Sequence, residues 1–505
     1  MSRKVFRLLF LLMLHASLAV AQDNIHIRTH SYGSYWEFPL AMDHVNYFDF
    51  NDDQSRLHAN VQGGVVVPFR SSEVDTITFQ GAPTSFTENR YKVFQMYITI
   101  NSGEAVTSKE EYVSCYVSVN GRGSYPHYSG KAKIRGRGNS TWEWYDKKPY
   151  RIKLDKKAPI LGLEANKDWV LLANYRDVTD LMNTFVFEAG HWLNMPCTNH
   201  TRYTEVFLNG EYIGLYQLTE QVEQGKGRVA VDEQRGILLA LDLDDGPGLS
   251  PKATDNFYSE VFNLPVCIKH PDEDDLTEAL KDSIKQVFAE LETAINNKSF
   301  SQANRLMDLR TYVRYLILQE LVLNVELVAP RSVFIHKDVD GKWTMGPLWD
   351  FDAGYDFDWA TMTTGHNYFS NHRELVLGTD PYRHRGCYDG GISPFFTRLF
   401  GNHGFVTLFK EEWNAMKSEI VDRNWEQMEL YLDELHRGTI TREFTRWPLR
   451  GKTYMNDVYA MRDWLVRRVN YLDGSSMPIR FHSRLLACSA CVIVQYSRIR
   501  MYVFT

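Results

Sequence analysis

Cysteine is scarce in this chain, with 6 residues among 505. So few, widely scattered cysteines exclude a small disulfide-stapled scaffold, and no pairing can be assigned from their positions. Cys488 and Cys491 form the one C-x-x-C pair. Because no second Cys pair or His pair accompanies it, the sequence does not predict a zinc or redox site there.

Long apolar runs and an excess of basic residues are also missing. After the first 21 residues, no stretch reaches about 18 uncharged apolar residues, so no later transmembrane helix is expected. The net charge of −7 excludes a protein that binds nucleic acid over a broad basic surface. Apolar residues make up 44% of the chain, which is enough for a large core and two or three domains.

The first residues have the pattern of a secretory signal peptide. A basic start at 3–7 precedes a short apolar run at 8–14, and small residues at 19–21 provide a cleavage site. No cysteine follows the apolar run, so a lipoprotein anchor is not expected. The sequence therefore predicts export to the periplasm, the cell surface or the medium.

Short alternating stretches followed by longer helical stretches predict a chain of the α+β class. Its expected parts are a signal peptide at 1–21, a β-rich leader at 22–105, a large α+β domain at 106–475 and an unassigned tail at 476–505. Within the large domain, Asn209-Gly210 lies between two strand-like runs, which predicts a two-residue hairpin turn.

The individual elements follow from local patterns. Strands are expected at 63–69, 73–79, 112–119, 148–154, 169–175 and 238–242, helices at 177–193, 276–297, 308–326 and over most of 395–475, and a hairpin at 332–352 with Asp340-Gly341 as its turn.

Acidic and aromatic residues are crowded together in GPLWDFDAGYDFDW at 346–359. If the hairpin strand continues to Asp352, then Asp350 and Asp352 lie on one face, about 6–7 Å apart along the strand. Such a pair of carboxylates suits a magnesium ion, which takes one or two carboxylates together with phosphate and water oxygens. Asp356 and Asp358 are expected to be solvated acids of a loop.

Two further stretches are candidates for chemistry. RGRGNSTW at 135–142 is a donor-rich turn followed by Lys147, Lys148, Arg151 and Lys153, and it suits phosphate oxygens, although it is not a G-x-x-x-x-G-K-[ST] loop. Taken alone, this stretch is explained better by a surface hairpin with solvated charges. Asn324 and Glu326 follow a long apolar run and indicate either a helix end or a site.

Taken together, six stretches resemble the CotH-type protein kinases, a family named for a spore-coat protein. They are RGRGNSTW (135–142), KKPYRIKL (147–154), KDWVLLANYRD (167–177), EVFLNGEYIGLYQLTEQV (205–222), QELVLNVE (319–326) and GPLWDFDAGY (346–355). The resemblance implies an atypical two-lobe kinase fold over 106–475, ATP and Mg²⁺ or Mn²⁺ as cofactors, and transfer of phosphate to Ser of a protein.

The kinase template also implies roles for particular residues. Arg137, Asn139 and Ser140 would cover the phosphates, and Lys153 would contact them. Glu188 would pair with that lysine, and Glu220 and Gln221 would line the adenine pocket.

The metal and catalytic residues implied by the resemblance lie further along the chain. Asn324, Asp350 and Asp352 would hold the metals, and Asp350, Asn324 and Glu326 would form the catalytic set. Family members usually have N-x-D where this chain has Asn324-Val325-Glu326, and Arg-Asn where it has Met182-Asn183.

These departures keep a second class of function open, a catalytically inactive kinase-like protein that binds at a surface as an adhesin does. A third class, a metal-dependent hydrolase using Asp350 and Asp352, has no His-rich partner motif in the sequence.

Overall fold

The computed structural model describes residues 24–81, 85–250, 253–358, 368–377, 392–448 and 453–474. The predicted signal peptide at 1–21 and the tail at 476–505 lie outside them. The chain divides into two compact units. Unit 1 comprises Met1–Thr184, Asn199–Gln221 and Glu426–Tyr454, and unit 2 comprises Phe185–Thr198, Val222–Trp425 and Met455–Thr505. Among the helices of the described ranges, none combines the length and the hydropathy needed to cross a membrane.

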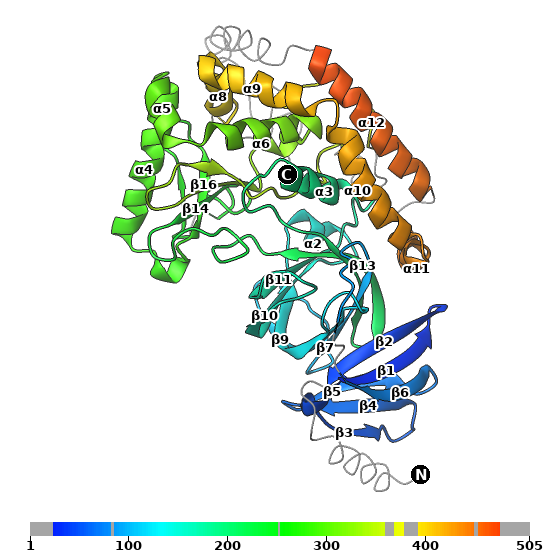
Figure 1. The fold of residues 1–505 in the computed structure, drawn as a ribbon. Helices are drawn as coiled ribbons and strands as arrows, with labels where there is room; N and C mark the ends of the chain where they lie inside the picture. The colour runs from blue at the N-terminus through cyan, green and yellow to red at the C-terminus, as the bar shows by residue number, and fades with distance from the viewer. Residues whose placement is uncertain are drawn as a thin grey trace, which may run out of the picture. The chain divides into compact units, whose positions relative to one another are not determined.

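Unit 1 is built mainly from strands (Figure 1). Its elements are β1 (Asn24–Ser31), β2 (Ser34–Ala41), η1 (Met42–His44), β3 (Val45–Phe50), β4 (Arg56–Val61), β5 (Val65–Arg70), β6 (Val74–Gln80), β7 (Phe94–Ile100), β8 (Val113–Asn120), β9 (Tyr128–Gly136), α2 (Ser140–Trp144), β10 (Tyr150–Ala158), β11 (Asn166–Leu172), β12 (Arg202–Leu208), β13 (Glu211–Glu220) and α11 (Thr439–Arg446).

The first six strands form two three-stranded antiparallel sheets, in the orders β2-β1-β6 and β3-β4-β5. The two sheets each turn apolar side chains toward one face, and these join a common core with residues on the outer face of the barrel described next. In that core the ring of Phe38 lies 4.9 Å from the ring of Phe69 and 3.4 Å from that of Tyr97. The strands predicted at 63–69 and 73–79 are confirmed as β5 and β6.

Seven strands close into a barrel in the order β10-β11-β13-β12-β7-β8-β9 (Figure 1). All neighbouring pairs are antiparallel except β7 and β12, which run parallel. The predicted hairpin turn is confirmed, since Asn209 and Gly210 connect β12 to β13 with φ of 52° and 84°, as a type I′ turn requires. The leader boundary predicted after residue 105 stays a prediction, and β7, which precedes it, belongs to the barrel.

Unit 2 combines one sheet with most of the helices (Figure 1). Its elements are β14 (Ile237–Leu241), β15 (Asn256–Tyr258), β16 (Pro265–His270), η2 (Glu273–Asp275), α4 (Glu278–Asn296), α5 (Phe300–Leu306), α6 (Leu309–Leu321), η3 (Val325–Leu327), β17 (Val333–Lys337), β18 (Thr344–Met345), α8 (Ile392–Thr397), η5 (Arg398–Gly401), α9 (His403–Met416) and α12 (Tyr454–Gly474). Three of the described helices contribute residues to both units: α3 (Met182–Trp192), α10 (Ile420–Leu435) and, through its first residue Tyr454, α12.

The sheet of unit 2 has the order β15-β16-β14-β17-β18, and all its pairs are antiparallel. α6 is buried along most of its length and packs against α9. Asp308 begins α6 as its N-cap, where its side chain accepts the N–H of Arg310. The structure is therefore a mixed α+β protein with a β-rich N-terminal region and a helical C-terminal part, as the sequence predicts.

The helix predicted to open at Asp177 begins five residues later, at Met182. The carboxylate of Asp177 accepts the N–H groups of Thr179 and Met182, both at 2.8 Å. An aspartate that binds main-chain N–H groups ahead of it favours a turn or cap over helix interior. The prediction thus found the helix and placed its start too early.

Glu292 on α4 is fully buried, with 0% of its surface exposed. Burial raises the pKa of its carboxyl to about 7, and hydrogen bonds from Ser259 Oγ and the N–H of Val261 act in the opposite direction. Because this pKa exceeds the unfolded value of about 4.3, the folded state holds the proton more tightly. The stability from this group is complete below about pH 4 and is lost as the pH rises to about 7.

We expect the Glu292→Gln variant to lack this pH-dependent part of the unfolding free energy, roughly 3 kcal/mol between the two limits. Urea unfolding at several pH values between about 4 and about 7 measures it. Glu290→Gln, an exposed position on the same helix, is the matched control. Parallel profiles for wild type and Glu292→Gln would contradict the assignment.

Candidate functional site

Several loops of unit 2 meet at one edge of its sheet. Leu241, the last residue of β14, pairs with Val333 at the start of β17, so the chain that leaves β14 lies opposite the chain that enters β17. β18 is antiparallel to β17 and therefore ends at the same edge. The N–H of Tyr355, in the loop after β18, donates to the carbonyl of Val322 at the end of α6, at 2.5 Å. The loops after β14, α6 and β18 are thus neighbours.

Asn324 joins two of the segments that the sequence singles out. Its Nδ2 donates to the main-chain carbonyl of Asp350 at 3.4 Å, and its Oδ1 accepts the N–H of Glu326 at 3.3 Å. Asn324 and Glu326 are 3% and 5% exposed, so both are part of the packed wall of this edge. The structure therefore brings Asn324, Glu326 and Asp350 together although the chain separates them.

The carboxylate of Asp350 lies beside the start of β17. Its Oδ2 accepts a hydrogen bond from Ser332 Oγ at 3.4 Å, and the side chain is half-buried. This position gives the carboxylate a fixed neighbour while leaving part of it accessible.

The prediction that 349–352 continue the hairpin strand is wrong. β18 ends at Met345, and Gly346 follows with a φ of 120°, a conformation that glycine adopts without steric cost. Asp350 then has a φ of 63°, so the two-residue alternation of a strand does not apply. Asp352 is buried, with 6% exposed, and does not share an open face with Asp350.

The aromatic residues of this stretch belong to the core. Trp349, Phe351, Tyr355 and Phe357 are all buried, with exposed fractions between 0% and 7%. They hold the loop in place, and these four residues do not form an exposed aromatic patch on the surface.

The two later acids of the stretch differ from one another. Asp358 is exposed, in agreement with the prediction of a solvated acid. The same prediction is wrong for Asp356, which is half-buried and whose Oδ2 accepts the N–H of Asn371. Trp359 lies outside the described residues.

Asp242 is a buried acid of this edge that sequence reasoning missed. Its carboxylate accepts the N–H of Ser332 at 2.9 Å and that of Asp244 at 2.8 Å. Burial, aided by the nearby charge of Asp245, raises the pKa of Asp242 to about 6. The sequence did contain a pattern that could have indicated this acid. Three aspartates lie at 242–245, at the end of a predicted strand, and acids at the end of a strand are also what indicated Asp350.

Backbone strain is concentrated at the same edge. Leu323, Ser332 and Asp350 have φ of 50°, 54° and 63°, in the left-handed region that non-glycine residues rarely adopt. Such residues cost about 1–3 kcal/mol each and cluster at functional sites. Gly354 lies here too, and a Cβ at this position would come within 2.7 Å of the carbonyl of Val322. The backbone at this edge therefore adopts conformations that these residues do not favour by themselves.

The oxygen-rich edge fits a hard divalent cation. Within the described ranges, no three His, Cys, Asp or Glu side chains converge closely enough to form a complete protein ligand set. Mg²⁺ does not need one, because it binds through one or two carboxylates and completes its shell with water and phosphate. Asp350 and the amide of Asn324 supply oxygen ligands of that kind.

In unit 1, the RGRGNST segment is a tight turn that leads into the short helix α2. Trp142 of α2 covers Gly136, where a Cβ would lie 2.4 Å from its ring. Arg137 and Ser140 are half-buried, and exposed Asn139 accepts a hydrogen bond from Lys109 Nζ through its Oδ1 at 3.2 Å. The sequence suggested a flexible donor-rich turn at 135–141. In the structure, packing of Trp142 and a hydrogen bond to Asn139 fix parts of this turn.

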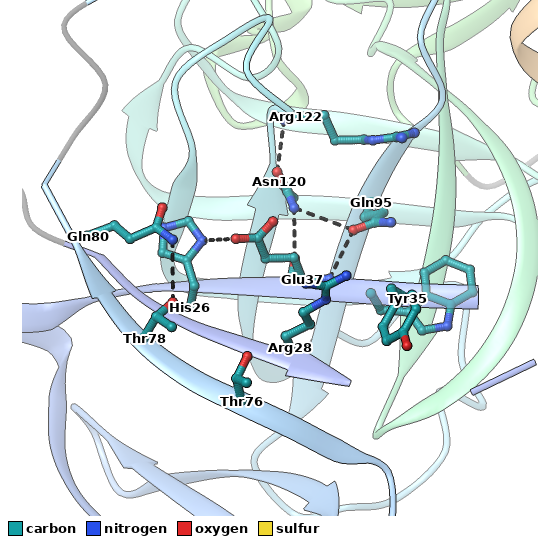
Figure 2. A pocket seen from close by; sticks show the side chains of 11 residues that line it. His26, Arg28, Tyr35, Glu37, Thr76, Thr78, Gln80, Gln95, Asn120 and Arg122 are labelled. Atoms are coloured by element: carbon teal, nitrogen blue, oxygen red, sulfur yellow. Dashed lines mark hydrogen bonds and ion pairs between the residues drawn. The ribbon is translucent and has the colours of Figure 1, made fainter. Parts of the chain in front are cut away.

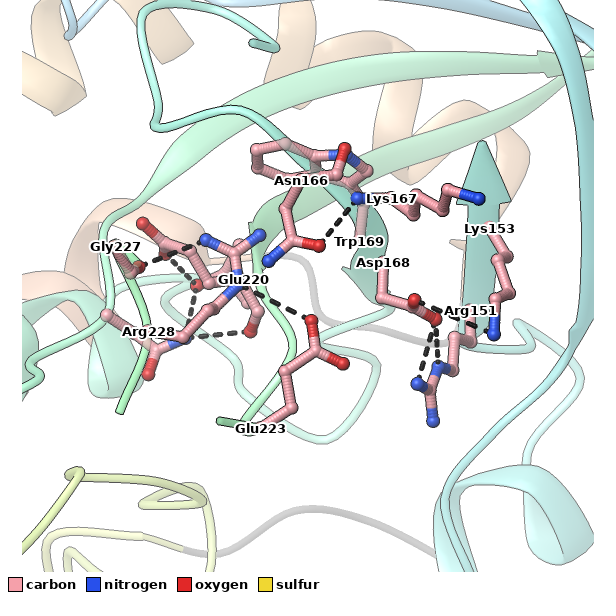
Figure 3. Close-up of polar contacts among 12 residues, drawn as sticks. Arg151, Lys153, Asn166, Lys167, Asp168, Trp169, Glu220, Glu223, Gly227 and Arg228 are labelled. Atoms are coloured by element: carbon pink, nitrogen blue, oxygen red, sulfur yellow. Dashed lines mark hydrogen bonds and ion pairs between the residues drawn. The ribbon is translucent and has the colours of Figure 1, made fainter. Parts of the chain in front are cut away.

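Lys153 projects from the outer face of β10 (Figure 3). It lies directly opposite Lys133 on β9 and opposite Asp168 on β11, with its Nζ 4.0 Å from Asp168 Oδ2. Arg151 Nη2 approaches Asp168 more closely, at 2.8 Å. Lys133 and Lys153 carry like charges and repel each other across the sheet. An anion bound here would reduce that repulsion.

The remaining predicted residues have clear local roles. The carboxylate of Glu220 accepts the N–H of His200 at 2.8 Å and lies 2.6 Å from its Nδ1. Gln221 is half-buried next to it, and Glu188, on the unit 2 part of α3, is 6% exposed. Their assignments to the adenine pocket and to the lysine pair stay predictions.

One buried ion pair of unit 1 was not found from the sequence. Lys147 Nζ lies 2.6 Å from Glu443 Oε1 on α11, and neither side chain has any exposed surface. Glu443 Oε2 also accepts the N–H of Leu215 on β13 at 2.7 Å. The pair fastens α11 to the barrel, and nothing in the local pattern of either residue indicated burial.

A comparison with protein families places these elements in context. The model of the CotH kinase protein family matches residues 134–472. The chain belongs to the CotH kinase family. No curated protein matches the chain.

The CotH kinase match contains every residue predicted for the site, from Arg137 to Asp352. Membership indicates protein kinase activity and implies ATP as the phosphate donor. The resemblance inferred from six sequence stretches is therefore confirmed at the level of the family. The two N-terminal sheets, at 24–80, precede the part of the chain that is matched.

Proposed function

We propose that this protein is an exported protein kinase that uses ATP and a divalent metal to phosphorylate Ser of another protein, on an atypical kinase fold. The observation that carries the proposal is the convergence of Asn324, Glu326 and Asp350 at one strained edge of the unit 2 sheet. Membership of the CotH kinase family supports the reaction class. Export rests on the basic and apolar pattern of residues 1–21.

Phosphate transfer in kinases depends mainly on positioning and on neutralising charge. Asp350 and Asn324 would hold a divalent metal that neutralises the charge of the phosphates, and Asp352, which is buried, is the third predicted ligand. Asn324 fixes the main chain of Asp350 through the hydrogen bond to its carbonyl, so the metal-binding carboxylate is pre-oriented.

The hydroxyl of the acceptor Ser forms a new bond to the γ-phosphorus, the bond from that phosphorus to the ADP oxygen breaks, and the hydroxyl proton needs an acceptor. Glu326, two residues after Asn324, is our choice for that acceptor. In unit 1, the proposed phosphate contacts are Arg137 and Asn139 in the turn before α2, Ser140 at its start, and Lys153 on β10, because their side chains supply hydrogen-bond donors or positive charge.

The first test is ligand binding. ATP with Mg²⁺ or Mn²⁺ at about 100 times its dissociation constant stabilises a folded protein by about 2.7 kcal/mol, so the melting temperature of the full chain should rise. The part of the shift that needs metal should vanish in Asp350→Asn. Asp340→Asn, an exposed aspartate in the turn between β17 and β18, should behave like wild type.

A metal-dependent shift that survives in Asp350→Asn would remove Asp350 from the metal site. No shift with ATP under any metal would remove nucleotide binding from the proposal altogether.

A catalytically inactive kinase-like protein is the second candidate. The observation that favours it is Glu326, which stands where the family usually has Asp and sets its carboxylate one methylene further from the main chain. Nucleotide binding without any phosphate transfer, followed by transfer in a Glu326→Asp variant, would establish this candidate.

A further inference from the structure

A polar cavity of about 480 Å³ lies in the N-terminal part of unit 1 (Figure 2). Its floor is one face of the β2-β1-β6 sheet, and its wall is formed by residues of β7, β8 and the turn after β8. None of the residues proposed for the kinase reaction lines it. It therefore calls for an explanation of its own.

The strand register explains why this sheet face is polar. Arg28 on β1 lies between Glu37 on β2 and Thr76 on β6, so the three side chains form one row across the sheet. Ile27 and Phe38, which pair across the same two strands, point to the opposite face and are buried in the core. The sheet thus keeps one apolar face for its core and offers the other, rich in hydrogen-bonding groups, to the cavity.

Among the residues that the structure describes, the side-chain amide of Gln95 has hydrogen-bond partners for its oxygen only. Gln95 is 7% exposed, and its Oε1 accepts hydrogen bonds from the hydroxyl of Tyr97 at 3.1 Å, the N–H of Glu37 at 3.3 Å and Nδ2 of Asn120 at 3.4 Å. Asn120 is itself oriented, because its Oδ1 accepts the N–H of Arg122 at 2.8 Å. These donors fix the Gln95 oxygen, and Nε2 is left without a hydrogen-bond partner among the described residues (Figure 2). This amide nitrogen lines the cavity, so its N–H groups are available to a ligand acceptor there.

The charges of the cavity are unequal. Glu37 is already engaged with Nδ1 of His26 at 2.6 Å, which lowers the pKa of Glu37 by hydrogen bonding. Arg122 donates to the carbonyl of Val93 at 2.6 Å and has no acidic partner in the part of the chain that is described. Arg28 lies 3.9 Å from the exposed carboxylate of Asp75 and also interacts through its charge with Glu37, which lies opposite it on β2. Two guanidinium groups therefore remain to attract an anion.

The cavity continues as a path rather than ending as a closed pocket. A second hollow of about 330 Å³ shares Tyr35, Gln95 and Arg122 with it, and its other charged lining residues are Lys92, Arg437, Arg442, Glu205 and Glu434. Tyr35 lies at the junction with 54% of its surface exposed, and the guanidinium of Arg28 lies 4.3 Å from the centre of its ring. A path of this kind fits a chain of polar units better than a single compact molecule.

We propose that this cavity binds an acidic glycan, a hydroxyl-rich sugar chain that carries carboxylates. Arg28 and Arg122 take the carboxylates, and the free N–H groups of Gln95 donate to hydroxyl or ring oxygens. Thr76 and Thr78 bind hydroxyls as both donors and acceptors. Sites for apolar ligands are lined mainly by hydrophobic side chains, and this one is not. The sheets at 24–80 would then anchor the protein to a polysaccharide, independently of any kinase reaction.

The test is native gel electrophoresis of the full-length protein through gels that contain a defined polymer. Polygalacturonate and alginate are the carboxylated glycans, mixed-linkage glucan is the neutral glycan, and polyglutamate is the polyanion without sugar. We expect the two carboxylated glycans to retard wild type, and Arg28→Ala to weaken this binding about tenfold or more. Gln95→Glu keeps the oxygen that accepts from Glu37 and Asn120, and should weaken binding similarly.

Arg56→Ala is the matched control, since Arg56 is an exposed arginine on the other N-terminal sheet of the same unit. It should bind like wild type. Absence of retardation by both carboxylated glycans would overturn the proposal. So would equal retardation by polyglutamate, by the neutral glucan, or an equal loss in Arg56→Ala, because binding would then not depend on carboxylated sugars at this cavity.

Discussion

Phosphate transfer from ATP is expected to fall at least about 10³-fold in both Asp350→Ala and Asp350→Asn, while the protein stays folded. The reason is electrostatic, because the carboxylate is the group proposed to hold the metal that neutralises the phosphates. The Asn variant is the sharper of the two. Asn adopts the left-handed conformation at φ of 63° at least as readily as Asp, so only the charge is lost.

The measurement is incorporation of labelled phosphate from γ-labelled ATP into the protein itself and into casein, with Mg²⁺ and with Mn²⁺. Asp340→Asn serves as the control for removal of an exposed carboxylate in unit 2. Circular dichroism melting confirms that each variant is folded. Full activity in Asp350→Asn would exclude Asp350 from the catalytic set.

Replacing Glu443 by alanine is expected to destabilise the protein by about 3–5 kcal/mol. The substitution takes the carboxylate away from Lys147, whose ammonium group has no exposed surface. It also removes the acceptor of the Leu215 N–H at 2.7 Å. A buried charge that loses its partner costs far more than an exposed one, because water cannot replace the missing oxygen.

Urea unfolding of Glu443→Ala and of Glu429→Ala, an exposed position on α10, measures the difference, and the control should change stability by less than about 0.5 kcal/mol. The double variant Lys147→Met with Glu443→Leu should recover much of the loss, since removing both charges leaves none unpaired. A cost below about 1 kcal/mol for Glu443→Ala would show that the pair contributes little.

Local patterns correctly predicted much of the secondary structure. Short strand-like stretches located β5, β6, β8 and β10, a continuous apolar run located β11, and the turn residues Asn209-Gly210 located the β12–β13 hairpin. These features depend on neighbours in the chain, namely the two-residue period of strands and the positive φ that a type I′ turn demands. The boundaries were weaker, as at Asp177, where a side chain binds main-chain groups and delays the helix.

For the candidate site, the sequence identified residue types that hold phosphate and metal, and it identified the family, which the match to residues 134–472 confirms. It failed where strand geometry was extended too far. Asp350 and Asp352 were expected on one strand face, but β18 ends at Met345 and a left-handed residue separates the two acids. The alternation of side chains along a strand does not show where its hydrogen bonding to a neighbouring strand ends.

Composition, turn chemistry and motif order were determined by the sequence itself, because each depends on residues close together in the chain. Only the tertiary structure decided that β7 closes the barrel beside β12, that Asn324 binds the main chain of Asp350, and that Lys147 meets Glu443. Those pairings join segments far apart in the chain. The energies of these pairings depend on burial and on the removal of water around charges. Neither can be read from residues that are neighbours in the chain.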